Sequence, residues 1–261
     1  MLVQVIAKTT QKKLILTRIN SFTILISDDI PNGDISITSK GITMSLQESD
    51  LWRAFHDLGT EMIINRCGRR MFPHLVVKCS GIEPSGIYKL MLEINAADDR
   101  RYKYVNNSWT PMGMADPERQ NLPFFHSDGF EKGSALLEKR ASFAKLKLTN
   151  NRESSNGNIV LYSMHKYIPK ITLIKFRDNR KDIEMQYVFS FPETAFVAVT
   201  AYQNDRITKL KILSNPFAKA FRDGRGVKIK ASGPESSTSQ LRRQRENKEG
   251  RMPSTDLKDK A

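Results

Sequence analysis

Short runs of β-branched and aromatic residues, separated by turn clusters, dominate the middle of this chain and constrain its fold more than any other feature. Many short strands with hairpin-like spacing and few helices predict an all-β domain, an antiparallel sandwich or barrel. The separating clusters are Cys67-Gly68, Ala96–Asp99, Asn150-Asn151 and Asn204-Asp205. The expected strands are 61–65, 70–78, 87–94, 101–105, 142–148, 158–163, 169–177, 186–191 and 195–201.

A short helix is expected after the last strand. Asn215-Pro216 suits a helix start, because asparagine caps the first turn and proline loses no hydrogen bond at the first position. Phe217 and Phe221 are four residues apart, so both rings project from one face. Two interpretations remain open for this pair. The rings close the hydrophobic core, or they enter a DNA minor groove while cations such as Lys219 and Arg222 hold phosphates.

Composition divides the chain into three parts. Residues 1–45 read as a variable extension, 46–227 as one domain, and 228–261, which are rich in Ser, Gly, Arg and Glu, as a disordered basic tail. The chain carries a formal net charge of +14. Residues 46–227 hold 28 basic and 20 acidic side chains, so most of the excess belongs to the domain. A polyanionic partner is therefore expected. Near the start of the domain, residues 51–58 form an amphipathic helical turn that Gly59 stops.

Cysteine usage and hydropathy narrow the class of protein. Cys67 and Cys79 lack a CxxC partner or a histidine at finger spacing, so they read as reduced intracellular thiols and not as a zinc site. The apolar stretch 14–26 is too short to span a membrane and contains Arg18. It could supply one strand. The chain is expected to be soluble, with no membrane partner.

No local signature of catalysis, metal binding or cofactor binding is visible. There is no nucleophile elbow, no paired-carboxylate motif and no Gly-rich phosphate loop. The histidines are scattered, at positions 56, 74, 126 and 165. We therefore expect no enzyme, no catalytic residue, no metal and no cofactor, although a triad assembled across the chain stays open.

Two basic segments suit nucleic acid. Arg69 and Arg70 follow a tight turn, and in an extended segment one can point outward while the other braces the scaffold. An outward guanidinium can donate two hydrogen bonds to guanine in the major groove. Residues 142–150 alternate apolar and polar side chains, as in a half-buried strand with Lys145 and Lys147 on its wet face. Taken alone, each segment fits a solvated surface better than a contact with nucleic acid.

Eight short motifs follow one another between residues 48 and 224. They are Leu51–Phe55, Gly59–Ile64, Gly68–Pro73, Arg101–Lys103, Lys145–Asn151, Ser163–Tyr167, Phe196–Asn204 and Asn215–Phe221. The ordered set resembles the T-box domain, the DNA-binding module of the Brachyury family. One such motif would be weak evidence, but the collinear set is very specific.

The resemblance implies an immunoglobulin-like β-sandwich, closed into a partial barrel, with short C-terminal helices that contact DNA. It also implies a nuclear, sequence-specific transcription factor that binds double-stranded DNA at a GGTGTGA-like element and regulates RNA polymerase II transcription with co-regulators. Activation or repression, and a monomer or a homodimer on palindromic sites, stay open.

The resemblance also assigns roles to residues. Arg69 matches an arginine that reads a guanine, and Lys147 a lysine at the DNA face. Phe217 and Phe221 match rings that enter the minor groove, which favours the wedge over the core. Thr200, Tyr202 and Lys166 are the candidates for phosphate contacts, and Met164, Val197 and Val199 those for the core.

Some positions depart from the family pattern. Histidine-proline-aspartate becomes His126-Ser127-Asp128, and a tryptophan-methionine pair becomes Leu136-Leu137. Arg140 and Ile168 stand where proline and glutamine are usual. These changes leave DNA specificity and dimer contacts undetermined, because this region lies near nucleic acid in family members.

Two other functions fit parts of the pattern. An immunoglobulin-like adhesion module shares the fold class, but it would want an inter-sheet cysteine pair and a signal peptide. A single-strand nucleic-acid binder would use stacked aromatic rings. Competition between duplex and single strand separates the second from the T-box interpretation.

Overall fold

The computed structural model describes five ranges of the chain, all in the first of two units, residues 1–219 and 220–261. The described ranges are 18–19, 22–23, 34–117, 121–154 and 157–215. Strands supply most of their regular structure and helices are few, which confirms the all-β prediction. The helices are α1 (Ser49–Asp57), α2 (Gly133–Glu138), α3 (Asp205–Ser214) and the 3-10 turn η1 (Pro192–Thr194).

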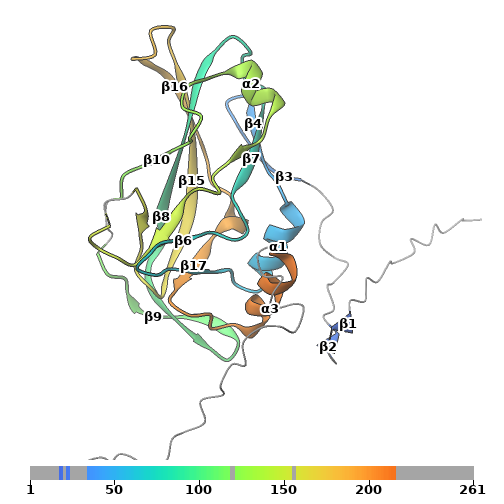
Figure 1. The fold of residues 1–261 in the computed structure, drawn as a ribbon, viewed down its shortest axis with the longest axis vertical. Helices are drawn as coiled ribbons and strands as arrows, with labels where there is room; N and C mark the ends of the chain where they lie inside the picture. The colour runs from blue at the N-terminus through green and yellow to red at the C-terminus, as the bar shows by residue number, and fades with distance from the viewer. Residues whose placement is uncertain (1–17, 20–21, 24–33, 118–120, 155–156, 216–261) are drawn as a thin grey trace, which may run out of the picture. The chain divides into compact units, whose positions relative to one another are not determined.

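The strands form three sheets and one separate pair (Figure 1). The eight-stranded sheet has the order β10-β8-β15-β17-β5, with β9 and β11 also on β8 and β16 on β15. The others have the orders β12-β7-β4-β3 and β14-β13-β6, and β1 pairs with β2. The bounds are β1 Arg18–Ile19, β2 Phe22–Thr23, β3 Ile35–Ser39, β4 Ile42–Leu46, β5 Glu61–Ile63, β6 Arg69–Arg70, β7 Val76–Ser80, β8 Ile87–Val105, β9 Ser108–Met114, β10 Phe124–Phe125, β11 Glu131–Lys132, β12 Ala141–Ser142, β13 Lys147–Thr149, β14 Ile159–Val160, β15 His165–Phe176, β16 Ile183–Phe189 and β17 Phe196–Val199.

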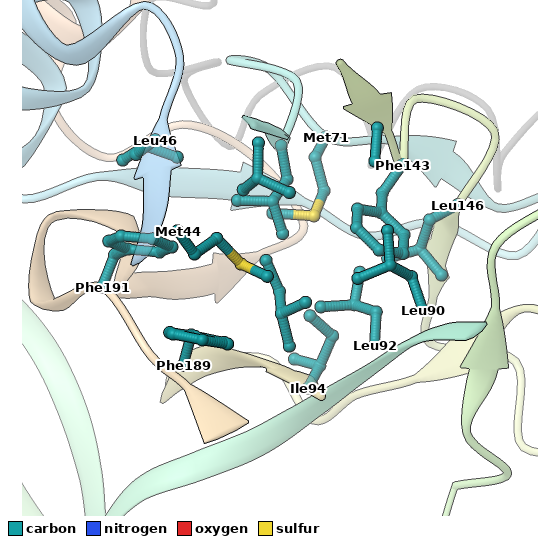
Figure 2. Packing of buried hydrophobic residues seen from close by; sticks show 14 of the residues in the cluster. Met44, Leu46, Met71, Leu90, Leu92, Ile94, Phe143, Leu146, Phe189 and Phe191 are labelled. Carbon is teal, nitrogen blue, oxygen red and sulfur yellow. The ribbon is translucent and has the colours of Figure 1, made fainter. Parts of the chain in front are cut away.

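One hydrophobic core joins the two larger sheets. Alternate residues of β8, such as Leu90 and Leu92, point inward, as the period of a strand requires. They belong to the same buried cluster as Leu173 of β15. Met44 of β4 is another member, and Figure 2 shows it together with Leu90 and Leu92. Burying each such side chain contributes about 1.5–3 kcal/mol. Two sheets that share one core in this way form a sandwich. At the turn between β3 and β4, the Lys40 ammonium also contacts the sulfur of Met185 in β16 (3.5 Å).

The hairpin β3–β4 belongs to this core, although the sequence placed it in the extension 1–45. Ile35, Ile42 and Met44 are buried, and β4 pairs with β7. Lys40 and Gly41 both have positive φ, 49° and 81°, as a two-residue hairpin turn needs. The sequence analysis did not predict this hairpin, because the hairpin follows a polar turn and contains no long apolar run.

The predicted turn at Ala96–Asp99 is wrong, because β8 continues through it. The strand is irregular there instead: its register against β15 shifts between His165 and Tyr167. The Asp98 carboxylate accepts hydrogen bonds from the Tyr102 hydroxyl (2.5 Å) and the Arg100 backbone N–H (3.0 Å). Aspartate thus shapes a bulge here and not a chain reversal.

The reversal comes later, at two asparagines. Asn106 and Asn107 have φ of 50° and 60°, and they join β8 to β9, a strand that the sequence did not predict. Asparagine tolerates this left-handed region better than most residues, which favours a two-residue hairpin. The rings of Tyr104 and Trp109 pack across it.

Two strands expected to be continuous are broken. Segment 70–78 divides into β6 and β7, with Pro73 between them, a residue that has no N–H to donate to a ladder. Segment 142–148 divides into β12 and β13, because a turn at Phe143 closes with the Leu146 N–H donating to the Phe143 carbonyl (3.0 Å). Lys145 and Lys147 are nevertheless exposed, as predicted.

The helix predicted at 51–58 is confirmed as α1. Trp52 and Phe55 are buried on one side of it. Gly59 has φ of 75° directly after the C-cap, and its N–H donates to the His56 carbonyl (2.9 Å). A glycine in the left-handed region ends a helix without a Cβ clash.

Both cysteines are free thiols, with Cys67 exposed and Cys79 buried. Burial raises the pKa of the Cys79 thiol to about 11. In the described ranges no helix has the length and apolarity to cross a membrane.

Candidate nucleic-acid interface

The parallel strands β5 and β17 bring two segments with predicted DNA-binding residues to one edge of the large sheet. Val199 lies opposite Ile63, and the next N–H, of Ile64, donates to the Val199 carbonyl (2.8 Å). The carboxyl ends of parallel strands meet at the same edge. Segments 65–70 and 200–204, which hold three of the eight predicted DNA-binding residues (Arg69, Thr200 and Tyr202), therefore leave the sheet side by side.

Thr149 attaches β13 to the same edge. Its hydroxyl, fully buried, donates to the Asn65 carbonyl (2.7 Å) and accepts from the Asn151 N–H (3.0 Å). Gly68 has φ of 77°, and a Cβ there would lie 3.3 Å from the Lys147 Cβ. This close approach and the positive φ explain glycine in the turn before Arg69.

Arg69 and Arg70 are both exposed, so the expectation that one of them braces the scaffold is wrong. The register with β13 places Arg70 opposite Lys147, and Arg69 opposite Leu148. Cross-strand neighbours share a face, so Lys147 stands beside Arg70 and not beside Arg69. Arg69 instead lies close enough to Tyr202 and Lys211 for its charge to act on both: it opposes the rise that burial causes in the pKa of Tyr202, and it adds to burial in lowering the pKa of Lys211.

The edge is rich in unneutralised positive charge. Within the described residues, no ion pair engages the five cations of segments 66–70 and 145–147. Exposed cations without internal acids are free to meet an external anion, and phosphates suit guanidinium groups in particular. The five are Arg66, Arg69, Arg70, Lys145 and Lys147.

The two candidates for phosphate contacts that follow β17 differ in exposure. Thr200 is exposed, whereas Tyr202 is half-buried, with the Lys211 ammonium 4.9 Å from its ring centroid. Burial raises the pKa of the Tyr202 hydroxyl, and the Arg69 charge opposes the rise. Of the predicted core residues of this part, Val197 and Val199 are buried, and Met164 is only half-buried, with φ of 65°.

Asn204-Asp205 starts helix α3, so the turn predicted there is wrong. The Asn204 side chain accepts from the Arg206 N–H (2.9 Å) and donates to the Leu58 carbonyl at the end of α1 (2.9 Å). Asparagine with extended dihedral angles is a preferred N-cap. Asp205 adds a negative charge in the first turn, where the helix dipole favours it. Asparagine and aspartate favour both turns and helix N-caps, so the local pattern predicted a turn where a helix begins.

Glu61 is a structural residue of this edge that the sequence analysis did not single out. It is fully buried, and its carboxylate accepts hydrogen bonds from the backbone N–H groups of Gln203 (2.8 Å) and Asn204 (3.0 Å). Burial raises the pKa of this carboxyl, while both hydrogen bonds and Lys211 oppose the rise. The sequence did contain a signal, because Glu61 is an acid that begins an otherwise apolar strand. A buried acid of this kind needs partners, and here they anchor segment 200–204.

Four predicted DNA-binding residues, Phe217, Lys219, Phe221 and Arg222, lie outside the described residues. The described chain ends at Asn215, the C-cap of α3, whose φ of −84° and ψ of 117° are extended. Extended geometry is expected before a proline, and it also suits the N-cap predicted for the next helix.

Most departures from the family pattern now have positions in the fold. Leu136 in α2 is buried and Leu137 packs against the core, so both serve packing. Ser127 is exposed and donates to Asp128, and Arg140 is exposed. Ile168 is half-buried on β15, opposite Asn95.

His126, Asp128 and Glu131 lie within reach of one another, as a metal site would need. The Lys139 ammonium, however, contacts both carboxylates, at 2.5 Å from Asp128, and holds the pKa of that carboxyl below its usual range. A cation of the protein itself thus occupies the position between the acids.

The structure is thus a β-sandwich with a cation-rich edge, and helix α3 follows the last strand. A family model described as T-box matches residues 44–223. The T-box transcription factor TBX5 of Homo sapiens is 46% identical over 186 residues, 70% of this chain and 36% of that protein. TBX5-A of Danio rerio is 43% identical over 204 residues (77% and 42%), and TBX4 of Homo sapiens 45% over 188 residues (71% and 34%).

The chain belongs to the T-box family. It spans about two fifths or less of the length of these relatives. The matched region begins inside β4, so the strand β3 precedes it.

Proposed function

We propose that this chain is a sequence-specific, double-stranded DNA-binding regulator of transcription. The observation that carries the proposal is the cation-rich edge, where Arg69, Arg70 and Lys147 stand on the paired strands β6 and β13 without acidic partners in the described part of the chain. The T-box relatives, which are named transcription factors, support it.

The finer proposals follow from the family. The target is a GGTGTGA-like element, the readout is RNA polymerase II transcription in the nucleus, and co-regulators join through surfaces still to be identified. The DNA-binding domain spans 46–227, and the hairpin β3–β4 adds to its core. Binding as a homodimer on palindromic sites is a further proposal of the same kind.

Selection of bound duplexes from a random pool tests this function. The full chain should enrich a GGTGTGA-like sequence, and a single strand should compete poorly with the duplex. A pool that shows no enrichment would reject sequence-specific binding. Preferential binding of the single strand would instead favour the stacking mode of recognition.

Lys147 should contact the DNA backbone. The logarithm of the affinity should fall linearly with the logarithm of the salt concentration, with a slope of about −0.9 for each phosphate neutralised. Lys147→Ala should make the slope shallower by about one such contact. Titrations of a labelled duplex at several salt concentrations measure this, and an unchanged slope would mean that Lys147 is only solvated.

Phe217 and Phe221 should act as wedges in the minor groove. Replacing either by alanine should then weaken duplex binding, by about tenfold or more, while the melting temperature of the free protein stays near that of the wild type. If the rings were core, each replacement would lower the free energy of unfolding by about 3–5 kcal/mol. Thermal melting together with duplex binding distinguishes the two roles, and Phe221 should be the more sensitive position.

A further inference from the structure

Lys211, on the second turn of α3, is a buried lysine behind the cation-rich edge. Only 7% of its surface is exposed, and its Nζ donates to the backbone carbonyl of Glu61 (2.6 Å). The rings of Tyr202 and Phe55 lie 4.9 and 5.8 Å from the ammonium. The side chain thus ties α3 to β5 from within.

This lysine has no carboxylate partner among the described residues. The carboxylate of Glu61 accepts hydrogen bonds from the N–H groups of Gln203 and Asn204. The Lys211 ammonium therefore donates to the Glu61 carbonyl and, at 3.9 Å, to the Met62 sulfur. Arg69 adds a like charge from β6. A buried ammonium with such neighbours destabilises the fold, because burial and a like charge both disfavour the charged form. A costly group of this kind is a candidate for a role in function.

We propose that Lys211 is a positioning residue for DNA binding, which holds α3 beside Arg69 and takes up a proton when a phosphate group of DNA arrives. This inference rests on the proposed function. Before binding, Arg69 repels a charge on Lys211. A phosphate at the edge reverses this, because an anion near a lysine favours the ammonium form.

Burial and two charged neighbours act on the pKa of Lys211. Burial first, and then the Arg69 charge, lower the pKa of Lys211 to about 7, while Glu61 opposes the change. Tyr202, the third titratable neighbour, has a pKa raised by its burial, so its hydroxyl stays neutral near pH 7. Lys211 is therefore poised to change its charge near neutral pH.

Linkage gives the sign of both pH effects. If binding raises the proton affinity of Lys211, then acid must strengthen binding, since coupling between two ligands is reciprocal. In the free protein, the pKa of Lys211 is lower in the folded state than in the unfolded state. Below about pH 7 the lysine is charged in both states, and its full destabilising effect on the fold is present. The stability of the protein therefore rises with pH between about pH 7 and the ordinary pKa of 10.5.

The test compares the full chain with Lys211→Met at constant salt, from about pH 6 to about pH 9. Affinity of the wild type for the selected duplex should fall above about pH 7, by up to about tenfold per pH unit. Lys211→Met should show a flatter profile and weaker binding at the acid end. Its melting temperature at about pH 6 should equal or exceed that of the wild type, because a buried charge has been removed.

Two further variants sharpen the comparison. Lys209→Met removes a charge from the exposed side of the same helix and should retain the pH dependence of the wild type. Lys211→Arg keeps a charge at all of these pH values, so it should bind in acid and lose the pH dependence. Calorimetry of the wild type in two buffers of different ionisation enthalpy counts the protons taken up, and it needs no variant.

Several results would overturn the inference. They are a wild type that binds the duplex without proton uptake, a Lys211→Met profile parallel to that of the wild type, or a Lys211→Met protein that melts earlier while its folded fraction binds normally. If the wild type bound no specific duplex at all, the proposed function itself would fail, a result distinct from all of these.

Discussion

Gly133→Ala should lower the free energy of unfolding by about 3 kcal/mol, the largest effect that we expect from one added methyl group. Gly133 is the first residue of α2, and a Cβ there would lie 2.0 Å from the carbonyl oxygen of Glu83. Backbone atoms cannot yield as the end of a flexible side chain does. The loop and the helix must therefore separate.

The effect of this substitution should reach the hydrophobic core. The Gly133 N–H donates to the Gly86 carbonyl (2.9 Å), and the Glu83 N–H to the buried Tyr88 hydroxyl (3.1 Å), so the loop links α2 to β8. Gly113→Ala is the matched control, because the space around Gly113 is open, and its effect should stay within about 0.5 kcal/mol. Denaturant unfolding measures both, and equal stability of the two variants would contradict the contact.

Arg69→Ala should weaken binding to the selected duplex by about 1–3 kcal/mol and relax discrimination at one base pair, if its guanidinium pairs with a guanine. The turn from Asn65 to Gly68 precedes Arg69, and the buried Thr149 hydroxyl donates to the Asn65 carbonyl, so this turn holds Arg69 at the edge. Binding to duplexes with each base substituted at that pair measures the change.

Arg70→Ala is the control for this prediction. Arg70 stands beside Lys147 on the ladder with β13, where a phosphate contact is expected. Its loss should weaken binding about equally for all sequences and make the salt slope shallower. If Arg69→Ala behaved in the same way, Arg69 would be a phosphate contact and not a reader of bases.

Local patterns predicted those elements whose structure depends on neighbouring residues. Helix α1 and its stop at Gly59 follow from amphipathic spacing and a left-handed glycine, both of which are local properties. The strands β15 and β16 follow from runs of β-branched and aromatic residues. The ordered motifs indicated the family, and the family in turn implied the sandwich, because members of one family share one fold.

Elsewhere the same residues have two local solutions, and contacts distant in sequence select one. Asp98 suits a turn, but its bond to Tyr102 and the partner strands keep β8 extended. Asn204 suits a turn as well, but its cap and its bond to Leu58 make it the start of α3. Propensity is weak against such contacts, which is why these predictions failed.

The sequence by itself determined the all-β class, the excess of positive charge, the family and the exposed lysines of β13. Each of these depends on composition, on order or on alternation along the chain. Only the tertiary structure decided that Lys147 stands beside Arg70, that Glu61 anchors the segment before α3, and that Lys211 is buried behind Arg69. Burial and charge environment arise from residues far apart in sequence, about 140–150 positions for Glu61 and its partners, and no local pattern carries them.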